Sequence, residues 1–149
     1  MNIRRAVSKD ANELSQLAMR SKAYWPYPAD YLEKCVEALR IDENYIQNWP
    51  VFVGESDQRS FGFFALKNIA GENRLDHLWI DPPFIKMGFG KSLFHRSVQE
   101  AQLLKWNSFR LAADPYALDF YLRLGGHQIG TVQSRIKPDL FLPHIEFKF

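Results

Sequence analysis

Two glycines at the start of a predicted helix mark the part of the sequence best suited to bind an anion. Gly88 and Gly90 follow a predicted strand and two prolines, and a long helical pattern begins at Gly88. The first turn of a helix has unpaired N–H groups and the positive end of the helix dipole, which favour a phosphate. Lys86 and Lys91 can add positive charge on either side. Residues 80–91 are therefore predicted to bind a phosphate rather than only to form a tight turn.

Two common nucleotide-binding motifs do not fit this loop. Gly90-Lys91-Ser92 resembles the end of a P-loop, but that motif needs a glycine at position 85, where the chain has Ile85. The dinucleotide-binding fingerprint needs a third glycine at position 93, which is Leu93. Arg110 also interrupts the apolar strand before Asp114 that a nucleotide-hydrolysing site would use. A P-loop-like nucleotide-binding protein is therefore the weaker interpretation.

The loop and the strand before it resemble the coenzyme A loop of the GNAT superfamily of N-acetyltransferases. That loop is usually written Q/R-x-x-G-x-G/A and follows a strand that ends in L-x-V-x-P. Leu78-Trp79-Ile80-Asp81-Pro82 matches the strand end, with isoleucine for valine, and Gly88-Phe89-Gly90 matches the glycines. Ile85 stands where Gln or Arg is usual. The resemblance therefore implies that backbone amides hold the diphosphate, together with Lys86 or Lys91.

A second segment, residues 114–126, carries the same resemblance. The superfamily often has N-x-x-A-x-x-F-Y-x-x-x-G-F after its fifth strand, and four positions match in register. The matching residues are Ala117, Phe120, Tyr121 and Gly125. Asp114 stands where the family has Asn, and we favour a helix cap as its role. Gly126 replaces the final phenylalanine, and we expect this difference to affect packing rather than chemistry.

The resemblance implies that the protein uses acetyl-CoA as a co-substrate, without a metal, and transfers the acetyl group to a primary amine. The acceptor would be a small molecule or a peptide, and its amine would attack the thioester directly in a ternary complex. A non-catalytic acyl-CoA sensor with the same cleft is the alternative. The implied cofactor-binding residues are Leu78, Ile80, Ile85, Lys86, Met87, Gly88, Phe89, Gly90, Lys91, Asp114, Ala117 and Tyr121.

The implied reaction assigns roles to individual groups. By motif position the amide of Ile80 would polarise the thioester carbonyl as it becomes an oxyanion. Tyr121 matches the tyrosine that protonates the departing thiolate, and a phenol with a pKa of about 10 keeps its proton at neutral pH. Adjacent helix positions point to different sides. We therefore expect Phe120 to face the core and Tyr121 to face the cleft.

A base must also remove a proton from the acceptor ammonium, and Asp76 and His77 are the candidates. Strand alternation places Asp76 on the face of Leu78 and Ile80, with His77 opposite, unless a bulge changes the parity. Histidine suits proton transfer at neutral pH. Glu55 on the neighbouring strand is a weaker candidate, and a water chain could replace all three. A structural role stays open for each residue.

Aromatic residues crowd the sequence around the first two predicted helices. They could wall an amine pocket or hold a cation against their ring faces, and packing beside the prolines is an equal alternative. These residues are Tyr24, Trp25, Tyr27, Tyr31 and Trp49.

The apolar periodicity predicts the elements that position these residues. Strands are expected near residues 3–7 and at 51–55, 61–66, 75–80, 109–113, 128–132 and 145–149. Helices are expected around Leu14 and Leu17, around Leu32 and Cys35 behind a cap at Asp30, around Leu93 and Ala101, and around Phe120 and Leu124. The order β-α-α-β-β-β-α-β-α-β-β indicates a mixed α/β (α+β) sheet with antiparallel pairing in the middle. The GNAT acyltransferase fold has the same order.

Length and composition limit the remaining possibilities. The 149 residues leave room for one domain, residues 1–149, and the formal charge of +2 argues against a nucleic-acid partner. Cys35 is the single cysteine, and we expect it in the core rather than as a nucleophile. No apolar run is long enough for a membrane span or a signal peptide, so we expect a cytoplasmic protein without a membrane partner. A homodimer stays open.

Overall fold

The computed structural model describes all of residues 1–149, and it confirms the predicted mixed α/β fold. Every predicted strand and helix is present, and one short helix is added. In chain order the elements are β1 (Asn2–Arg5), α1 (Ala11–Ala23), α2 (Ala29–Ala38), α3 (Glu43–Asn48), β2 (Val51–Ser56), β3 (Arg59–Ile69), β4 (Glu72–Ile80), α4 (Phe89–Leu103), β5 (Ser108–Ala112), α5 (Leu118–Arg123), β6 (His127–Gln133) and β7 (Phe141–Lys148).

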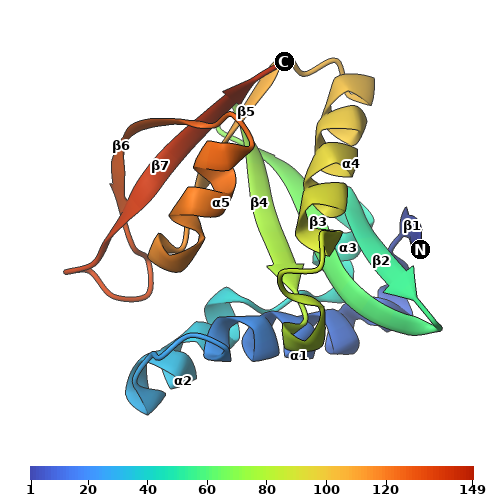
Figure 1. The fold of residues 1–149 in the computed structure, drawn as a ribbon, viewed down its shortest axis with the longest axis horizontal. Helices are drawn as coiled ribbons and strands as arrows, with labels where there is room; N and C mark the ends of the chain where they lie inside the picture. Colours follow the sequence, from blue (N-terminus) through green and yellow to red (C-terminus); the bar gives the residue numbers. More distant parts are fainter.

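The seven strands form one sheet in the order β1-β2-β3-β4-β5-β7-β6 (Figure 1). Neighbouring strands are antiparallel except β4 and β5, which are parallel. β4 pairs with β3 along its whole length, whereas β4 and β5 pair at one position only, Arg74 with Arg110. Beyond that pair β4 and β5 diverge toward their carboxyl ends. The sheet is therefore split into an N-terminal half, β1–β4, and a C-terminal half, β5–β7.

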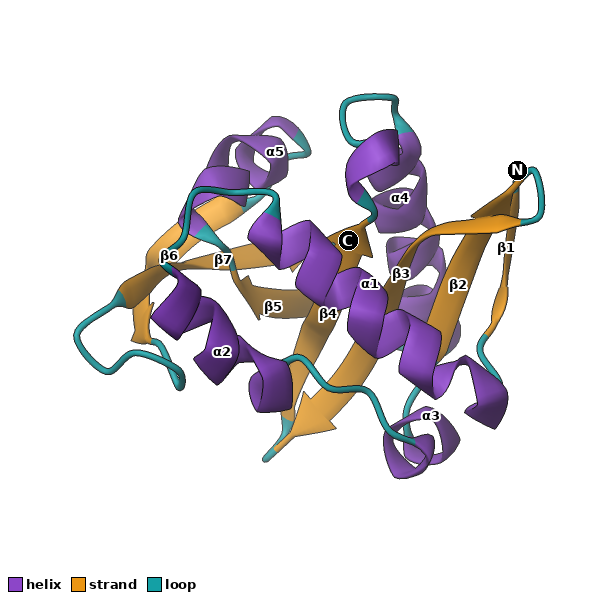
Figure 2. Cartoon of the chain, turned by 90° about the horizontal axis from the view of Figure 1, so that it is seen from below, coloured by secondary structure: helices purple, strands orange, loops and turns teal.

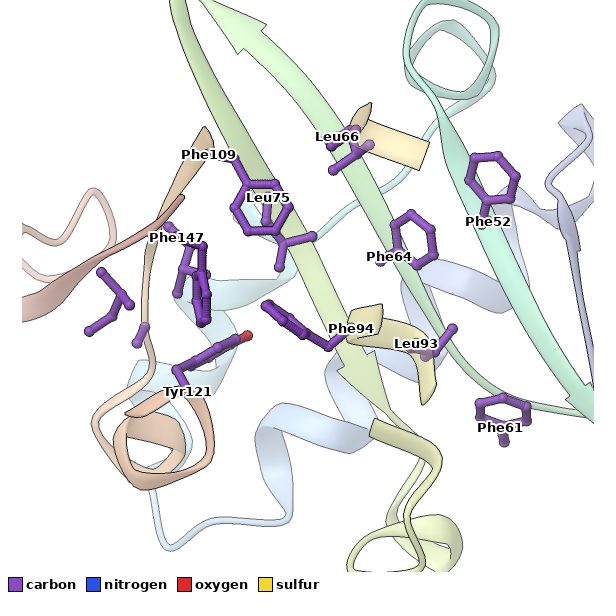
Figure 3. Packing of buried hydrophobic residues seen from close by; sticks show 14 residues of the cluster. Phe52, Phe61, Phe64, Leu66, Leu75, Leu93, Phe94, Phe109, Tyr121 and Phe147 are labelled. Atoms are coloured by element: carbon purple, nitrogen blue, oxygen red, sulfur yellow. The ribbon is translucent and has the colours of Figure 1, made fainter. Parts of the chain in front are cut away.

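Helices cover both faces of the sheet, and each face has its own hydrophobic cluster. α1, α2 and α3 pack on one face, where they bury Phe63 and Ala65 of β3. α4 and α5 pack on the other, against Phe64 and Leu66 (Figure 3). Alternate residues of β3 therefore point to opposite clusters, as expected of a strand that is covered on both sides. α1 runs diagonally across the sheet toward the side of α5 (Figure 2).

The second predicted helix differs in detail from its expectation. Pro28 is the N-cap of α2, and Asp30 lies inside the first turn, so the predicted cap at Asp30 is wrong. Tyr31 and Cys35 are the buried positions of α2, whereas Val36 is 50% exposed. Cys35 is fully buried, as expected of a core residue.

α3 is the helix that the sequence pattern did not predict. It has only six residues, and its N-terminus is capped by the side chain of Asp42, which accepts a hydrogen bond of 2.8 Å from the Tyr45 amide. Ile46 is its one buried residue, so too little apolar periodicity is present to mark it. Across the whole chain, no helix combines the length and apolar character needed to cross a bilayer.

Candidate active site

The glycine-bearing loop connects the end of β4 to the start of α4. After β4 ends at Ile80, a short 3₁₀ turn spans Pro82–Phe84. Gly88 then adopts a φ of +85°, in the left-handed region that favours glycine, and α4 begins at Phe89. No backbone amide of residues 86–91 donates a hydrogen bond within the chain. Six consecutive N–H groups at the positive end of a long helix are therefore available to a ligand of negative charge.

The amide of Ile80 faces the opening between the two halves of the sheet. The Asp81 amide donates to the Phe61 carbonyl at 2.8 Å, so this position forms a hydrogen-bonded pair with β3. Hydrogen bonding alternates along antiparallel strands, so the amides of Ile80 and Leu78 point away from β3. They point to the side of β5, where β4 has no ladder partner beyond Arg74. An unpaired strand amide there can donate to a ligand between β4 and β5.

Tyr121 lies deeper than the sequence predicted. Its side chain belongs to the cluster under α4 and α5, is 7% exposed, and packs beside Phe94 and Phe147 (Figure 3). Phe120 is less buried than Tyr121. Its ring lies against the start of α4, where a Cβ added to Gly90 would be 3.3 Å from it. The ring of Tyr121, which was expected to face the cleft, is therefore part of the core, and Phe120 packs only at the edge of that core.

The hydroxyl of Tyr121 nevertheless has the properties of a proton donor. It makes no hydrogen bond to any other group of the chain, and in Figure 3 it points away from α5 toward the side of Phe94. Burial raises the pKa of Tyr121 above its usual value, and the negative charge of Asp114 raises it further. The phenol is therefore protonated at neutral pH and free to donate to a ligand.

A β-bulge in β4 brings Asp76 and His77 to the same face of the sheet. Ala65 pairs with His77 and Leu66 with Leu75, so Asp76 is the extra residue. Asp76 accepts a hydrogen bond of 2.5 Å from the Tyr45 hydroxyl of α3, and its Oδ2 lies 3.8 Å from Nε2 of His77. Strict alternation would have placed these two side chains on opposite faces, and that expectation is wrong.

His77 is held in one protonation state by its neighbours. Trp79 donates from Nε1 to Nδ1 of His77 at 3.0 Å, which leaves the ring proton on Nε2, toward Asp76. The side chain is 9% exposed, and burial lowers the pKa of His77 below its usual value, although the charge of Asp76 opposes this shift. Nδ1 is thus engaged by Trp79, whereas Nε2 lies near Asp76 but beyond hydrogen-bond distance. Asp76, which is 20% exposed, is the better-placed proton acceptor of the two.

The buried state of His77 predicts a pH-dependent stability. Below a pH of about 6.5 the unfolded chain takes up a proton that folded His77 resists, so the free energy of unfolding should fall as the pH falls. One such proton gives a slope of about 1.4 kcal/mol per pH unit. In urea unfolding between about pH 5 and 6.5, His77→Gln should flatten this slope, and the exposed control His127→Gln should not. An unchanged slope in His77→Gln would contradict the assignment.

Most of the predicted aromatic residues gather in one place. Trp25 stacks on Tyr116 with 4.9 Å between ring centroids, and Tyr27 lies 4.9 Å from Tyr31. This group connects the segment between α1 and α2 to the start of α5. Trp49 is not part of it, because it follows α3 and packs near the ammonium of Lys67. Glu55, the weaker candidate base, forms an ion pair with Arg4 at 2.8 Å on β1.

Asp114 has the capping role expected from the sequence, and it also binds two side chains from the N-terminal part of the chain. Its Oδ1 accepts from the Tyr116 amide at 2.9 Å, which caps the turn before α5. Lys22 donates to Oδ2 at 2.7 Å, and the Tyr27 hydroxyl lies 2.8 Å from both oxygens. Burial and this hydrogen bond together raise the pKa of Tyr27. The carboxylate is thus committed to three groups of the chain.

The sequence analysis missed the residues that bind the segments directly after β4 and β5. Arg20 donates to Asp81 with two hydrogen bonds, of 2.9 and 3.3 Å, and Lys22 binds Asp114. Tyr45, the partner of Asp76, was also missed. The partners of these side chains lie 31 to 92 residues away, so no local pattern could have marked them.

Solved structures share this fold across almost the whole chain. PaiA N-acetyltransferase of Thermoplasma acidophilum, crystallised with coenzyme A, is 20% identical with a TM-score of 0.83 over 99% of this chain and 98% of its own. The putative acetyltransferase YncA of Salmonella typhimurium, with acetyl-CoA, is 15% identical with a TM-score of 0.71 over 99% and 93%. Ribosomal-protein-alanine N-acetyltransferase of Brucella melitensis is 18% identical with a TM-score of 0.71 over both whole chains.

The sequence itself points to the same family. No curated protein sequence matches it significantly. A family model described as an acetyltransferase (GNAT) domain, however, matches residues 29–136, which is well over half of the chain and includes the loop, β4 and the start of α5. The chain therefore belongs to the GNAT family of acetyltransferases and is an acyltransferase.

Proposed function

We propose that residues 1–149 form one N-acetyltransferase domain, which transfers an acetyl group from acetyl-CoA to a primary amine of a small molecule or peptide. The observation that carries the proposal is the run of unpaired amides in residues 86–91, next to a strand whose Ile80 amide faces the β4–β5 opening. Two structures with this fold were crystallised with coenzyme A or acetyl-CoA, which supports the choice of ligand.

In this proposal the diphosphate of acetyl-CoA binds the free amides of residues 86–91. Ile85 cannot add a polar side-chain contact, so Lys86 and Lys91, whose side chains are exposed, would supply the charge. Leu78 and Ile80 would line the extended arm of the cofactor. The residues of the loop and of the α5 segment that complete the proposed site are Met87, Gly88, Phe89, Gly90, Asp114, Ala117 and Tyr121.

The proposed reaction is direct attack of the amine on the thioester carbon. The Ile80 amide would donate to the carbonyl oxygen as its negative charge develops. Tyr121 would give its proton to the sulfur as the carbon–sulfur bond breaks, and Asp76 would take the proton that the acceptor ammonium must lose. His77, whose Nδ1 already accepts a proton from Trp79, would lie beside Asp76 without acting as the base.

A pair of glycines offers a sharp test of the cofactor site. Gly88 and Gly71 have the same φ, +85° and +84°, and no atom lies within 4 Å of a Cβ at either. Gly71 lies in the β3–β4 turn, at the end of β4 remote from the loop. Alanine at either position should cost about 1–2 kcal/mol of stability from left-handed backbone strain. Only Gly88→Ala should weaken acetyl-CoA binding, by about tenfold in calorimetry, because it disturbs the amide array.

Melting temperatures with two ligands separate the proposal from the nucleotide-binding alternative. Acetyl-CoA should raise the melting temperature of the wild type, because a ligand that binds only the folded state stabilises it. Mg-ATP should not. Equal acetyl-CoA affinity in Gly88→Ala and Gly71→Ala would place the cofactor elsewhere, and stabilisation by Mg-ATP alone would favour the nucleotide-binding alternative.

A further inference from the structure

The carboxyl ends of β4 and β5 are not held together by the sheet. The two strands share only the Arg74–Arg110 pair, so no ladder connects Ile80 at the end of β4 with Ala112 at the end of β5. In the proposed function this opening receives the acyl end of the cofactor. Some other contact must therefore set the separation of the two strand ends.

The last turn of α1 contacts both strand ends. Arg20 binds Asp81, the residue directly after β4, and Lys22 binds Asp114, two residues after β5. Residues two apart on a helix point about 200° apart around its axis, so the two side chains reach in opposite directions. In Figure 2 α1 crosses in front of the sheet and runs toward the side of α5, as this arrangement requires.

Both contacts hold a largely buried carboxylate in place, although the Arg20 side chain itself is 41% exposed. The Asp81 side chain is only 2% exposed and accepts two hydrogen bonds from Arg20, with Arg59 at 3.5 Å as a further partner. The Lys22 and Asp114 side chains are 7% and 11% exposed and 2.7 Å apart. Removing one partner of a buried ion pair leaves an uncompensated charge, whereas exposed ion pairs contribute little.

Aromatic rings restrict the Lys22 side further. The Lys22 ammonium lies 4.6 Å from the ring centre of Tyr27 and 5.4 Å from that of Tyr31, and the Tyr27 hydroxyl binds the same Asp114. The ammonium is thus enclosed by a carboxylate and two ring faces, and has little room to move.

We propose that Arg20 and Lys22 are positioning residues that set the separation of the ends of β4 and β5, and through it the acyl-chain length that the enzyme accepts. This inference rests on the proposed function. Arg20 holds the strand end that carries the Ile80 amide, and Lys22 holds the segment that leads to Tyr121. Loosening either contact lets the ends move apart and admits a longer acyl chain.

The test compares binding and turnover of acetyl-CoA and butyryl-CoA. The variants are Lys22→Met and Arg20→Gln, each of which removes a charge while keeping much of the side chain. The matched controls are Lys34→Met, an exposed lysine on α2, and Glu13→Gln, which removes only the exposed partner of Arg20. Dissociation constants come from calorimetry, and kcat/KM from thiol release with an amine that the wild type acetylates. Melting temperatures report the effect on stability separately.

In both Lys22→Met and Arg20→Gln the preference for acetyl-CoA over butyryl-CoA should fall at least fivefold, because pocket size alone discriminates chain lengths by about tenfold or more per methylene. The controls should keep the wild-type ratio. A lower melting temperature with an unchanged ratio would show a merely structural role and overturn the inference. If Lys22→Met does not fold, Arg20→Gln decides by itself.

The binding ratio keeps this test separate from that of the proposed function. A wild type that binds both acyl-CoA esters without acetylating any amine would refute the proposed reaction, while the affinity ratios would still support or overturn the positioning role. A wild type that binds neither ester would overturn both.

Discussion

Replacing Tyr121 by phenylalanine is expected to lower kcat about 100-fold, the lower end of what a general acid contributes. Stability and the affinity for acetyl-CoA should hardly change. The Tyr121 hydroxyl makes no hydrogen bond within the chain, so its removal leaves no buried partner unsatisfied. The ring remains packed beside Phe94 and Phe147. The variant therefore isolates the proton transfer to the thiolate from the packing of the core.

Tyr116→Phe is the matched control for this prediction. Tyr116 lies five residues earlier, its hydroxyl also makes no hydrogen bond within the chain, and its stacked ring is unaffected by the change. It should keep wild-type kcat. Steady-state kinetics with acetyl-CoA and calorimetric binding check both variants. If Tyr121→Phe kept more than half of the wild-type kcat, another group would have to protonate the sulfur.

Asp76→Asn is expected to lower kcat/KM by about 100-fold at pH 7, since the acceptor ammonium would lose its base. Asparagine can still accept the hydrogen bond from Tyr45, so the fold around α3 should be kept. The loss should shrink as the pH rises toward the pKa of the acceptor, about 10.4 for a lysine-like amine, because a neutral amine no longer needs a base. A pH profile of kcat/KM measures this directly.

His77→Gln decides between the two neighbouring candidates. Since the His77 ring is buried and its Nδ1 already accepts the Trp79 proton, this variant should reduce kcat/KM far less than Asp76→Asn, and without a comparable rescue at high pH. The opposite ranking of the two variants would assign the base to His77. Equal, small effects in both would point to a water chain.

Local chemistry made the framework of the site predictable from the sequence. Where β4 ends and α4 begins depends on Ile80, the prolines after it and Gly88, which are neighbours in the chain. The capping of the α5 segment by Asp114 likewise needs only the two residues that follow it. Apolar periodicity predicted the order of the elements along the chain, apart from α3 and small differences in bounds, and the fold class followed from that order.

Long-range packing decided what the sequence could not predict. The bulge at Asp76 arises in the pairing of β4 with β3, and the partner of Asp76 is Tyr45, on a helix too short and polar to be recognised. Tyr121 is buried because α5 lies against α4 and β7, which its own helical position does not reveal. The glycine at position 126, where the family has phenylalanine, also depends on long-range packing. A Cβ there would come within 2.6 Å of the Ile145 side chain.

The central claim is that this chain acetylates an amine, and release of coenzyme A from acetyl-CoA across a panel of amines tests it most directly. The panel would include small diamines, amino acids and short peptides with free amino termini, each with the wild type and with Tyr121→Phe. The account predicts amine-dependent thiol release by the wild type, a matching acetylated product by mass spectrometry, and about 100-fold slower release by Tyr121→Phe. Tight acetyl-CoA binding without release for any amine would contradict it and favour a non-catalytic acyl-CoA sensor.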